Sequence, residues 1–269
     1  MSQPPDWLPE DVDLVKPSAA RCYDYYLGGA HNFAVDRELA EQVLAQVPYG
    51  RDVARDNRAF LRRAVRYCVA NGVRQFLDIG SGIPTVGNVH EVAQAVDPDC
   101  RVVYVDNEPV AVAHSRTILE GNDNATALQA EFADVDGVLE RAETRRLLDF
   151  SRPVGLMLIA LAHFVADAER PHEIVRRYAD RLAPGSYLAL SHLTDDDYPE
   201  KVHGPQESYK ASSNPFHPRS RAQVAALTTD FELVEPGLVH LPEWRPDAAE
   251  DRWENPETSL LYAAVGRKV

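Results

Sequence analysis

Three acidic residues follow three successive segments that have the composition of buried strands. Asp78 lies in an apolar run that leads into a glycine loop, Asp106 ends a run rich in valine, and Glu131 follows a shorter third run. Because the carboxyl ends of parallel strands meet at one edge of a sheet, we expect these acids to lie together. A group of carboxylates at that edge suits a ligand that carries positive charge and vicinal hydroxyl groups.

The glycine loop, Gly80-Ser81-Gly82, allows a ligand to approach the backbone closely, because glycine has no Cβ to collide with it. A tight strand-to-helix connection would use the same residues. The spacing departs from the glycine pattern of dinucleotide-binding proteins, since Thr85 occupies the place of the third glycine. Asp106 follows the loop by roughly 20 residues, the separation at which an acid accepts the hydroxyl groups of a ribose. S-adenosylmethionine, which has a sulfonium, an ammonium and a ribose but no pyrophosphate, fits this set.

The elements that would position these residues alternate between strand and helix. Five strands are expected over 74–79, 101–105, 126–130, 154–162 and 186–191, with helices between them, among them one over 135–148. Helices over 36–47 and 52–71 come first, and closing strands over 231–241 and 259–266 come last. A long loop or short helix is expected over 192–217, and Ser220 with Gln223 predicts a capping box for a last helix. The pattern predicts a doubly wound, mostly parallel α/β sheet of seven strands with an antiparallel edge hairpin. We expect one structural domain, in which residues 1–72 pack on and cap a core formed by 73–269.

The segment 17–33 is dense in aromatic residues and contains a Gly-Gly pair. Tyr23, Tyr26 and His31 could belong to a lid over a ligand pocket. A helix that packs on the core would have the same composition, so both interpretations stay open at this point.

Composition restricts the partners. The chain of 269 residues has 42 acidic residues against 28 Lys and Arg, a net charge of −14, so nucleic acid and anionic membranes are not expected as partners. The three cysteines form no CxxC pair and are expected as buried free thiols, and the nine histidines show no metal-ligand spacing. No secretory signal or membrane-spanning run is visible, and we expect a cytoplasmic protein.

The segments QFLDIGSGIPT and VVYVDNEPVAVAHSR resemble the nucleoside-binding half of class I S-adenosylmethionine-dependent methyltransferases, which have a Rossmann-like fold. More narrowly, ARCYDYYLGGAHNFAVDRELAEQ and NRAFLRRAVRYCVANGVRQFLDIGSGIPT resemble an actinobacterial family of candidate methyltransferases, long known as a domain of unknown function. The resemblance covers roughly residues 17 to 267. It implies a methyltransferase with S-adenosylmethionine as its cofactor and a small molecule as its methyl acceptor.

The resemblance also implies roles for individual residues. Glu131 would accept from the adenine amino group, where the family usually has Asp, and Asp134 competes with it for this role. The other implied cofactor contacts are Asp78 to the ammonium, Gly80, Ser81 and Gly82 to the methionine part, Asp106 to the ribose, Asn107 and Phe132 to the adenine, and Ala160 and Leu161 to the methionine tail.

Transfer of a methyl group needs in-line alignment, and a base where the acceptor must lose a proton. His163 and His192 are candidate bases because they follow predicted strands, and His31 is a weaker candidate. Each could instead be a hydrogen-bonded turn residue. Two other functions stay open: an NAD-linked oxidoreductase, and a sensor that binds S-adenosylmethionine without transferring its methyl group.

Overall fold

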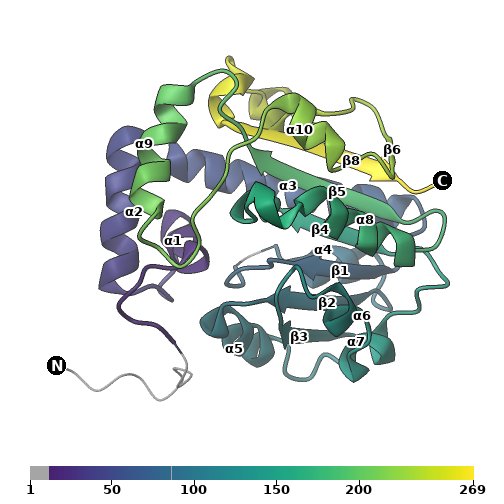
Figure 1. Cartoon of the computed structure of the whole chain (residues 1–269). Coiled ribbons are helices and arrows are strands. Elements are labelled where there is room, and N and C mark those ends of the chain that lie inside the picture. The colour runs from purple at the N-terminus through teal and green to yellow at the C-terminus, as the bar shows by residue number, and fades with distance from the viewer. Residues whose placement is uncertain (1–11, 86) are drawn as a thin grey trace.

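A computed structural model describes residues 12–85 and 87–269 and contains one sheet with strand order β3-β2-β1-β4-β5-β8-β6 (Figure 1). The five parallel strands are β3 (Ala125–Gln129), β2 (Arg101–Asp106), β1 (Gln75–Ile79), β4 (Gly155–Ile159) and β5 (Tyr187–Leu193). β8 (Leu261–Arg267) runs antiparallel to β5, and β6 (Glu232–Leu233) and β7 (Val239–His240) both pair with β8. The predicted doubly wound, mostly parallel sheet with an antiparallel edge is confirmed.

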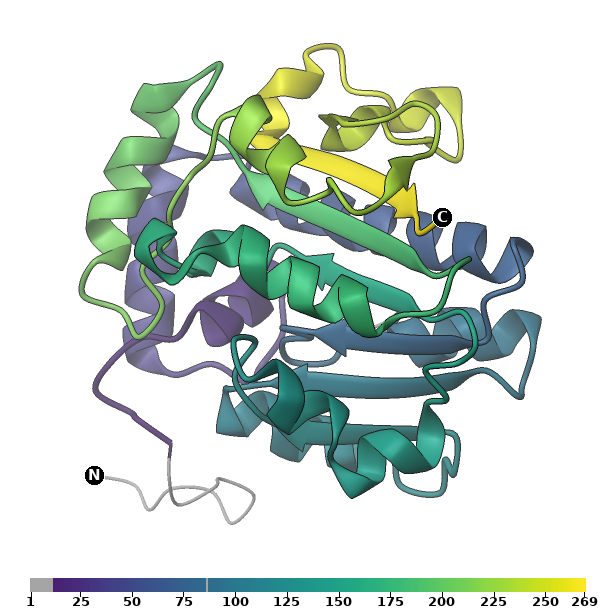
Figure 2. The ribbon, with the colours of Figure 1, turned by 45° about the vertical axis from the view of Figure 1, so that its right-hand side comes forward.

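Helices cover both faces of the sheet (Figure 1 and Figure 2). One face carries α3 (Gly50–Ala70), α4 (Val89–Val96) and α5 (Pro109–Ile118); the other carries α6 (Val135–Leu139), α7 (Ala142–Leu147), α8 (Pro171–Arg181) and α10 (Arg221–Ala226). Side chains alternate along each strand, so Phe76 packs toward α3 and Leu77 packs toward α8. Short 3-10 turns complete the chain: η1 (Ala162–Phe164), η2 (Asp167–Glu169), η3 (Leu241–Glu243), η4 (Ala249–Asp251) and η5 (Pro256–Ser259).

Two elements are shorter than predicted. The strand expected over 154–162 ends at Ile159, because Ala160 has a φ of 53° and leaves the strand conformation. The helix expected over 135–148 is two helices, α6 and α7. The break is stabilised by the Thr144 hydroxyl, which donates to the Val138 carbonyl at the end of α6.

The carboxyl-terminal region also differs in detail from the prediction. The strand expected over 231–241 is interrupted, which leaves β6 and β7 as separate pieces and brings the sheet to eight strands. Pro236 lacks an N–H for the ladder and Gly237 has a φ of 87°, so the chain turns away between them. Ser220 and Gln223 do form the predicted capping box of α10. Cys22, Cys68 and Cys100 are buried and free, as predicted. Within the described part of the chain, no helix is long and apolar enough to cross a membrane.

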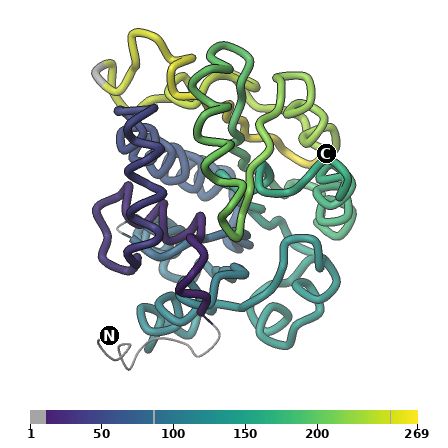
Figure 3. Tube along the Cα trace, turned by 60° about the vertical axis from the view of Figure 1, so that its left-hand side comes forward, coloured from purple at the N-terminus to yellow at the C-terminus, as the bar shows by residue number. Residues whose placement is uncertain are grey.

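Three helices form a cap at the carboxyl edge of the parallel strands: α1 (Ala19–Tyr26), α2 (Ala34–Gln46) and α9 (Pro199–Tyr209) (Figure 3). α9 lies in the segment 192–217 and packs against α2, so residues distant in sequence close the cap together. The cap has its own buried apolar cluster, formed by Cys22, Leu39, Ala40, Val47, Val202, Tyr209, Phe216 and Leu260.

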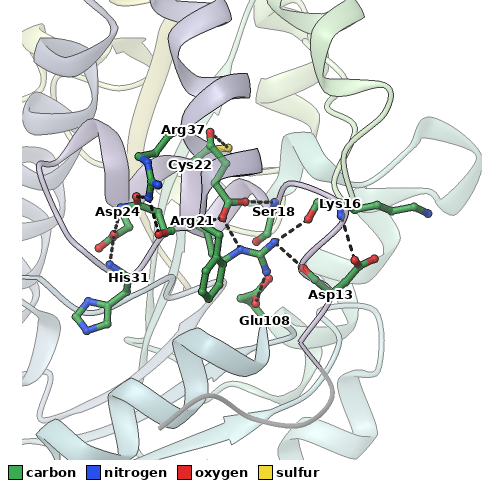
Figure 4. A network of polar contacts seen from close by, with 12 residues as sticks. Asp13, Lys16, Ser18, Arg21, Cys22, Asp24, His31, Arg37 and Glu108 are labelled. Atoms are coloured by element: carbon green, nitrogen blue, oxygen red, sulfur yellow. Dashed lines mark hydrogen bonds and ion pairs between the residues drawn. The ribbon is translucent and has the colours of Figure 1, made fainter. Parts of the chain in front are cut away.

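The Gly28-Gly29 pair is a fixed turn after α1. Gly28 has a φ of 83°, and a Cβ on Gly29 would collide with the Asp24 carboxylate. That carboxylate accepts from the His31 backbone N–H and from the Asn32 amide at 2.9 and 2.8 Å (Figure 4). The turn is therefore held by hydrogen bonds rather than free to act as a hinge.

Arg21 joins the cap to the sheet (Figure 4). Its guanidinium is 1% exposed and donates to Asp36 Oδ2 at 2.8 Å and to Glu108 Oε1 at 2.9 Å. It also donates to the Asp13 and Lys16 carbonyls. Glu108 precedes α5 at the end of β2, so one buried cation connects α1, α2 and the edge of the sheet.

Replacing Arg21 is expected to destabilise the fold strongly. In Arg21→Met the carboxylates of Asp36 and Glu108 stay buried without their cation, so the free energy of unfolding should fall by about 3–5 kcal/mol. Urea denaturation at pH 7.5 measures this change. The matched control is Arg55→Met, which breaks the exposed pair with Asp52 and should cost less than about 1 kcal/mol. Equal losses in the two variants would contradict the role given to Arg21.

Candidate functional site

A cavity of about 340 Å³ lies between the cap and the carboxyl edge of the sheet. Its volume is within the range of small-molecule sites. On one side are the ends of β1 to β4 and the loops that follow, here called the rim: cavity-lining residues 78–82, 106–108, 130–132 and 159–161. On the other side is the cap half: the cavity-lining residues within 18–26, 43–47, 163–165, 193, 201–209, 214–216 and 259–261. α3 forms the floor between the two.

Most of the predicted site residues line this one cavity. They are Asp78, Gly80, Ser81, Gly82, Asp106, Asn107, Glu131, Phe132, Ala160, Leu161, His163, Tyr23 and Tyr26. His31 and His192 are not among its lining residues.

Asp78 is buried at the centre of the rim. No group in the described residues donates a hydrogen bond to its carboxylate, and no cation lies within ion-pair distance. Burial, with a smaller effect of the nearby Asp106, raises the pKa of Asp78 to about 7 against the opposing effect of Arg58 on the floor. The side chain is therefore a buried acid whose charge no hydrogen bond or ion pair among the described residues compensates.

Asp106 is fixed by the backbone around it. Its carboxylate accepts from the Gly82 N–H at 2.7 Å and from the Glu108 N–H at 2.9 Å. Burial raises the pKa of Asp106 to about 6, against the effect of these backbone hydrogen bonds. Gly82 has a φ of 66°, and no atom lies within 4 Å of the place where its Cβ would be, so the loop leaves open space beside Asp106.

The loop after β3 contains Glu131 and Asp134, the two candidates for the contact to the adenine amino group, and places them differently. Glu131 lines the cavity, is exposed, and accepts from the Asn107 amide at 3.1 Å. Asp134 instead caps α6 by accepting from the Gly137 N–H, and it is not a lining residue. Phe132 is buried beside them, with its ring stacked on Tyr178 at 5.6 Å.

A chain of hydrogen bonds connects the cap to the loop after β4. The Tyr23 hydroxyl donates to the Ala54 carbonyl, and the Asn57 amide donates to Tyr23 Oη at 3.0 Å. Asn57 Oδ1 accepts from the Ser191 hydroxyl at 2.7 Å, and Ser191 Oγ accepts from the Ala160 N–H at 2.9 Å. Each of these groups is hydrogen-bonded to the next, and the last bond helps to hold Ala160 in its left-handed conformation.

His163 faces the cavity from η1. Its Nδ1 accepts from the Leu193 N–H at 3.3 Å, so the neutral ring carries its proton on Nε2. Burial places the pKa of His163 well below its ordinary value, and the nearby His192 and Arg219 lower it further. The ring is therefore neutral and presents a donor rather than an acceptor.

His192 lies behind the cavity wall. Its Nε2 accepts from Arg219 at 2.9 Å, and its Nδ1 donates to the Leu193 carbonyl at 2.7 Å. Burial lowers the pKa of His192 to about 3. With both ring nitrogens engaged and no access to the cavity, the geometry argues against the catalytic role predicted for it. His31 lies against His114 of α5, with the two rings tilted by 37° and their centroids 3.8 Å apart.

The model of the S-adenosyl methyltransferase family matches residues 5–269. The chain belongs to this family. A crystal structure of a candidate methyltransferase from Thermobifida fusca YX is 39% identical, with 98% of this chain and 99% of that chain covered and a TM-score of 0.90. A DUF574 family protein from Streptomyces avermitilis MA-4680 is 38% identical, with 94% and 98% covered and a TM-score of 0.91.

A more distant structure shares the fold alone. It is the N-methyltransferase NodS from Bradyrhizobium japonicum WM9 in complex with S-adenosyl-L-homocysteine, which is 12% identical, with 86% of this chain and 97% of that chain covered and a TM-score of 0.51. No sequence among curated proteins matches. The recognised family and the Rossmann-like methyltransferase fold are thus confirmed, and S-adenosylmethionine is the cofactor of this S-adenosyl methyltransferase.

The rim of this methyltransferase fits its cofactor. Asp78 is a buried carboxylate to which no described residue donates a hydrogen bond, and this matches an ammonium group; Asp106 borders open space beside a glycine of positive φ. Sequence patterns missed other cavity residues, among them Asn57, Arg58, Glu108, Lys201 and Tyr209, because helix periodicity does not tell which polar residue faces a cavity formed by another element. Of these, Glu108 had a signal, its place two residues after Asp106 and directly before Pro109.

Asp78 is expected to destabilise the free methyltransferase. Its pKa rises on folding from 3.8 to about 7, so its contribution to stability is most favourable below pH 4 and is lost as the pH rises through 7. Asp78→Asn should therefore raise the free energy of unfolding at pH 8 by about 1–3 kcal/mol, and by less at pH 5. Urea denaturation at the two pH values measures this. Asp123→Asn, an exposed control, should change little; a loss of stability in Asp78→Asn at pH 8 would contradict the assignment.

Proposed function

We propose that S-adenosylmethionine lies across the rim and that its methyl group passes in line to a small molecule held in the cap half. Asp78 would hold the ammonium, Gly80, Ser81 and Gly82 the methionine part, and Asp106 the ribose hydroxyls. Asn107, Glu131 and Phe132 would border the adenine, and Ala160 and Leu161 the methionine tail. The cofactor supplies a methyl group made electrophilic by a positively charged sulfur.

One observation carries this proposal: the rim and the cap half line the same cavity. A sensor needs only the cofactor half, whereas transfer needs a second compartment that faces the methyl group and excludes water. The cap half faces the rim across the same cavity and is lined mainly by apolar and aromatic side chains, which suits a second compartment of this kind. Membership of the methyltransferase family argues against the NAD-linked alternative. The enclosure by three helices, together with the net charge of −14, favours a small acceptor over nucleic acid.

In this proposal His163 positions the acceptor instead of removing a proton from it. Its Nδ1 accepts from the Leu193 N–H, so the hydrogen of the neutral ring is on Nε2 and is available to an acceptor molecule in the cavity. A general base works best with a pKa near the working pH, and burial moves His163 away from that range.

The ribose role of Asp106 can be separated from its structural role. Asp106→Ala should weaken the binding of S-adenosylhomocysteine about 5–150-fold, the equivalent of about 1–3 kcal/mol for lost charge-assisted hydrogen bonds. Because Asp106 also holds the Gly82 loop, the same titration is made with the 2′,3′-dideoxy analogue. In isothermal titration calorimetry, Asp106→Ala should weaken the binding of that analogue only slightly. Equal losses with both ligands would leave Asp106 with the structural role alone.

The protonation state of His163 is directly measurable. In long-range proton–nitrogen NMR spectra recorded from pH 5 to pH 8, its ring should remain the neutral Nε2–H form, because burial and neighbouring cations disfavour the charged ring. His163→Asn, whose side-chain oxygen can still accept from Leu193, assigns the signal. Titration of this ring near pH 7, with or without S-adenosylhomocysteine, would restore the general-base hypothesis.

A further inference from the structure

The two sides of the cavity differ in charge. Four carboxylates belong to the rim: Asp78, Asp106, Glu108 and Glu131. The described lining residues of the cap half include no acid at all, and their one charged side chain is Lys201 of α9. Lys201 is half-buried, with its Nζ 5.7 Å from the centroid of the Tyr49 ring, and no carboxylate in the described chain lies within ion-pair distance of it. A cationic acceptor would therefore meet an unpaired cation and no counter-charge.

The remaining lining of the cap half is apolar or aromatic. Tyr23, Tyr26, Tyr209, Phe164 and Phe216 face the cavity beside Val43, Val47 and Val202. Burial raises the pKa of Tyr26 and Tyr209, so both phenols stay neutral and act as hydrogen-bond donors. Their hydroxyls approach one another, yet Tyr26 Oη makes no well-formed hydrogen bond. This lining suits an apolar molecule that carries an acceptor for such donors.

Among the described lining residues of the cap half, none is placed to remove a proton from the acceptor. His163 is the one imidazole among them, and its Nδ1 lone pair is directed at the Leu193 N–H. The rim carboxylates face the cofactor in the function proposed above, and Glu108 is paired with Arg21. An alcohol, a phenol or an ammonium group must lose a proton before it can accept a methyl group, whereas a carboxylic acid is already ionised at neutral pH.

We propose that the methyl acceptor is an apolar carboxylic acid and that the product is its methyl ester. This inference rests on the proposed methyltransferase function and names the acceptor class of the same site. One carboxylate oxygen forms a bond to the methyl carbon while the carbon–sulfur bond breaks. The electron pair of the broken bond stays on sulfur. The carboxylate and the sulfonium neutralise each other, so no proton is transferred and no base is required. Lys201 attracts the carboxylate into the cap half.

The test compares molecules of one shape. 3-Phenylpropanoate, 3-phenylpropanamide, 3-phenylpropylamine and 4-propylphenol are titrated into the protein saturated with S-adenosylhomocysteine, and then incubated with the protein and labelled S-adenosylmethionine. The acid should bind at least about tenfold more tightly than the amide, the effect of one charged contact. Only the acid should take up label, in a form released as methanol by alkaline hydrolysis.

Two lysine variants, one on α9 and one at its end, test whether Lys201 causes the preference for the acid. Lys201→Gln should lose the tenfold preference for acid over amide while its affinity for S-adenosylmethionine is unchanged. Lys210→Gln is the matched control: this lysine is exposed, pairs with Glu207 and lies at the end of the same helix, so its variant should keep the preference.

Three outcomes would overturn the proposal: equal binding of acid and amide, methylation of the phenol or the amine, or full preference for the acid in Lys201→Gln. Failure of the wild-type protein to bind S-adenosylmethionine would instead reject the function on which the proposal rests. The cofactor titration distinguishes the two failures.

Discussion

The site depends on the burial of carboxylates that the free protein does not neutralise. No group in the described part of the chain donates a hydrogen bond to the Asp78 carboxylate, and Asp106 lies close enough to raise its pKa. Two buried acids of like charge are costly, and the strands that carry them supply the compensation, since Phe76, Leu77 and Val105 beside them are fully buried. The core therefore holds the rim in a geometry that the rim alone would not adopt. A cationic ligand that binds there gains the interaction that the protein lacks.

The cap is tied to this rim by two independent polar networks. Arg21 connects α1 and α2 to Glu108, whose backbone N–H donates to Asp106. On the opposite side, Tyr23 and Asn57 connect α1 through Ser191 to Ala160. Both networks start in one short helix and end at residues that line the cavity. Because α1 has 8 residues and would be marginal alone, its position is set by these contacts and by the apolar cluster that it shares with α2 and α9.

The sequence allowed the parallel sheet and most of the rim to be predicted because both depend on local patterns. Asp78, Asp106 and Glu131 follow apolar runs directly, and the topology of the fold brings strand ends together. The floor and the cap half were not predictable in this way. Asn57 and Arg58 look like ordinary polar positions of an amphipathic helix, and α9 lies in a segment with little apolar periodicity. The surroundings of His192 were not predictable for a related reason. It follows the predicted strand, but β5 extends to Leu193, and Arg219, which is distant in sequence, donates to its ring.

The opposite charges of the two halves also bear on turnover. Transfer removes the positive charge of the sulfonium, so the attraction between the donor and the rim acids weakens when the methyl group has left. In the proposed reaction the acceptor loses its negative charge in the same step, which ends its attraction to Lys201. Each half of the cavity then holds its substrate more strongly than its product, because the protein charges stay the same while both ligands become less charged. Interactions that differ between substrate and product in this way favour the release of both products and the entry of new substrates.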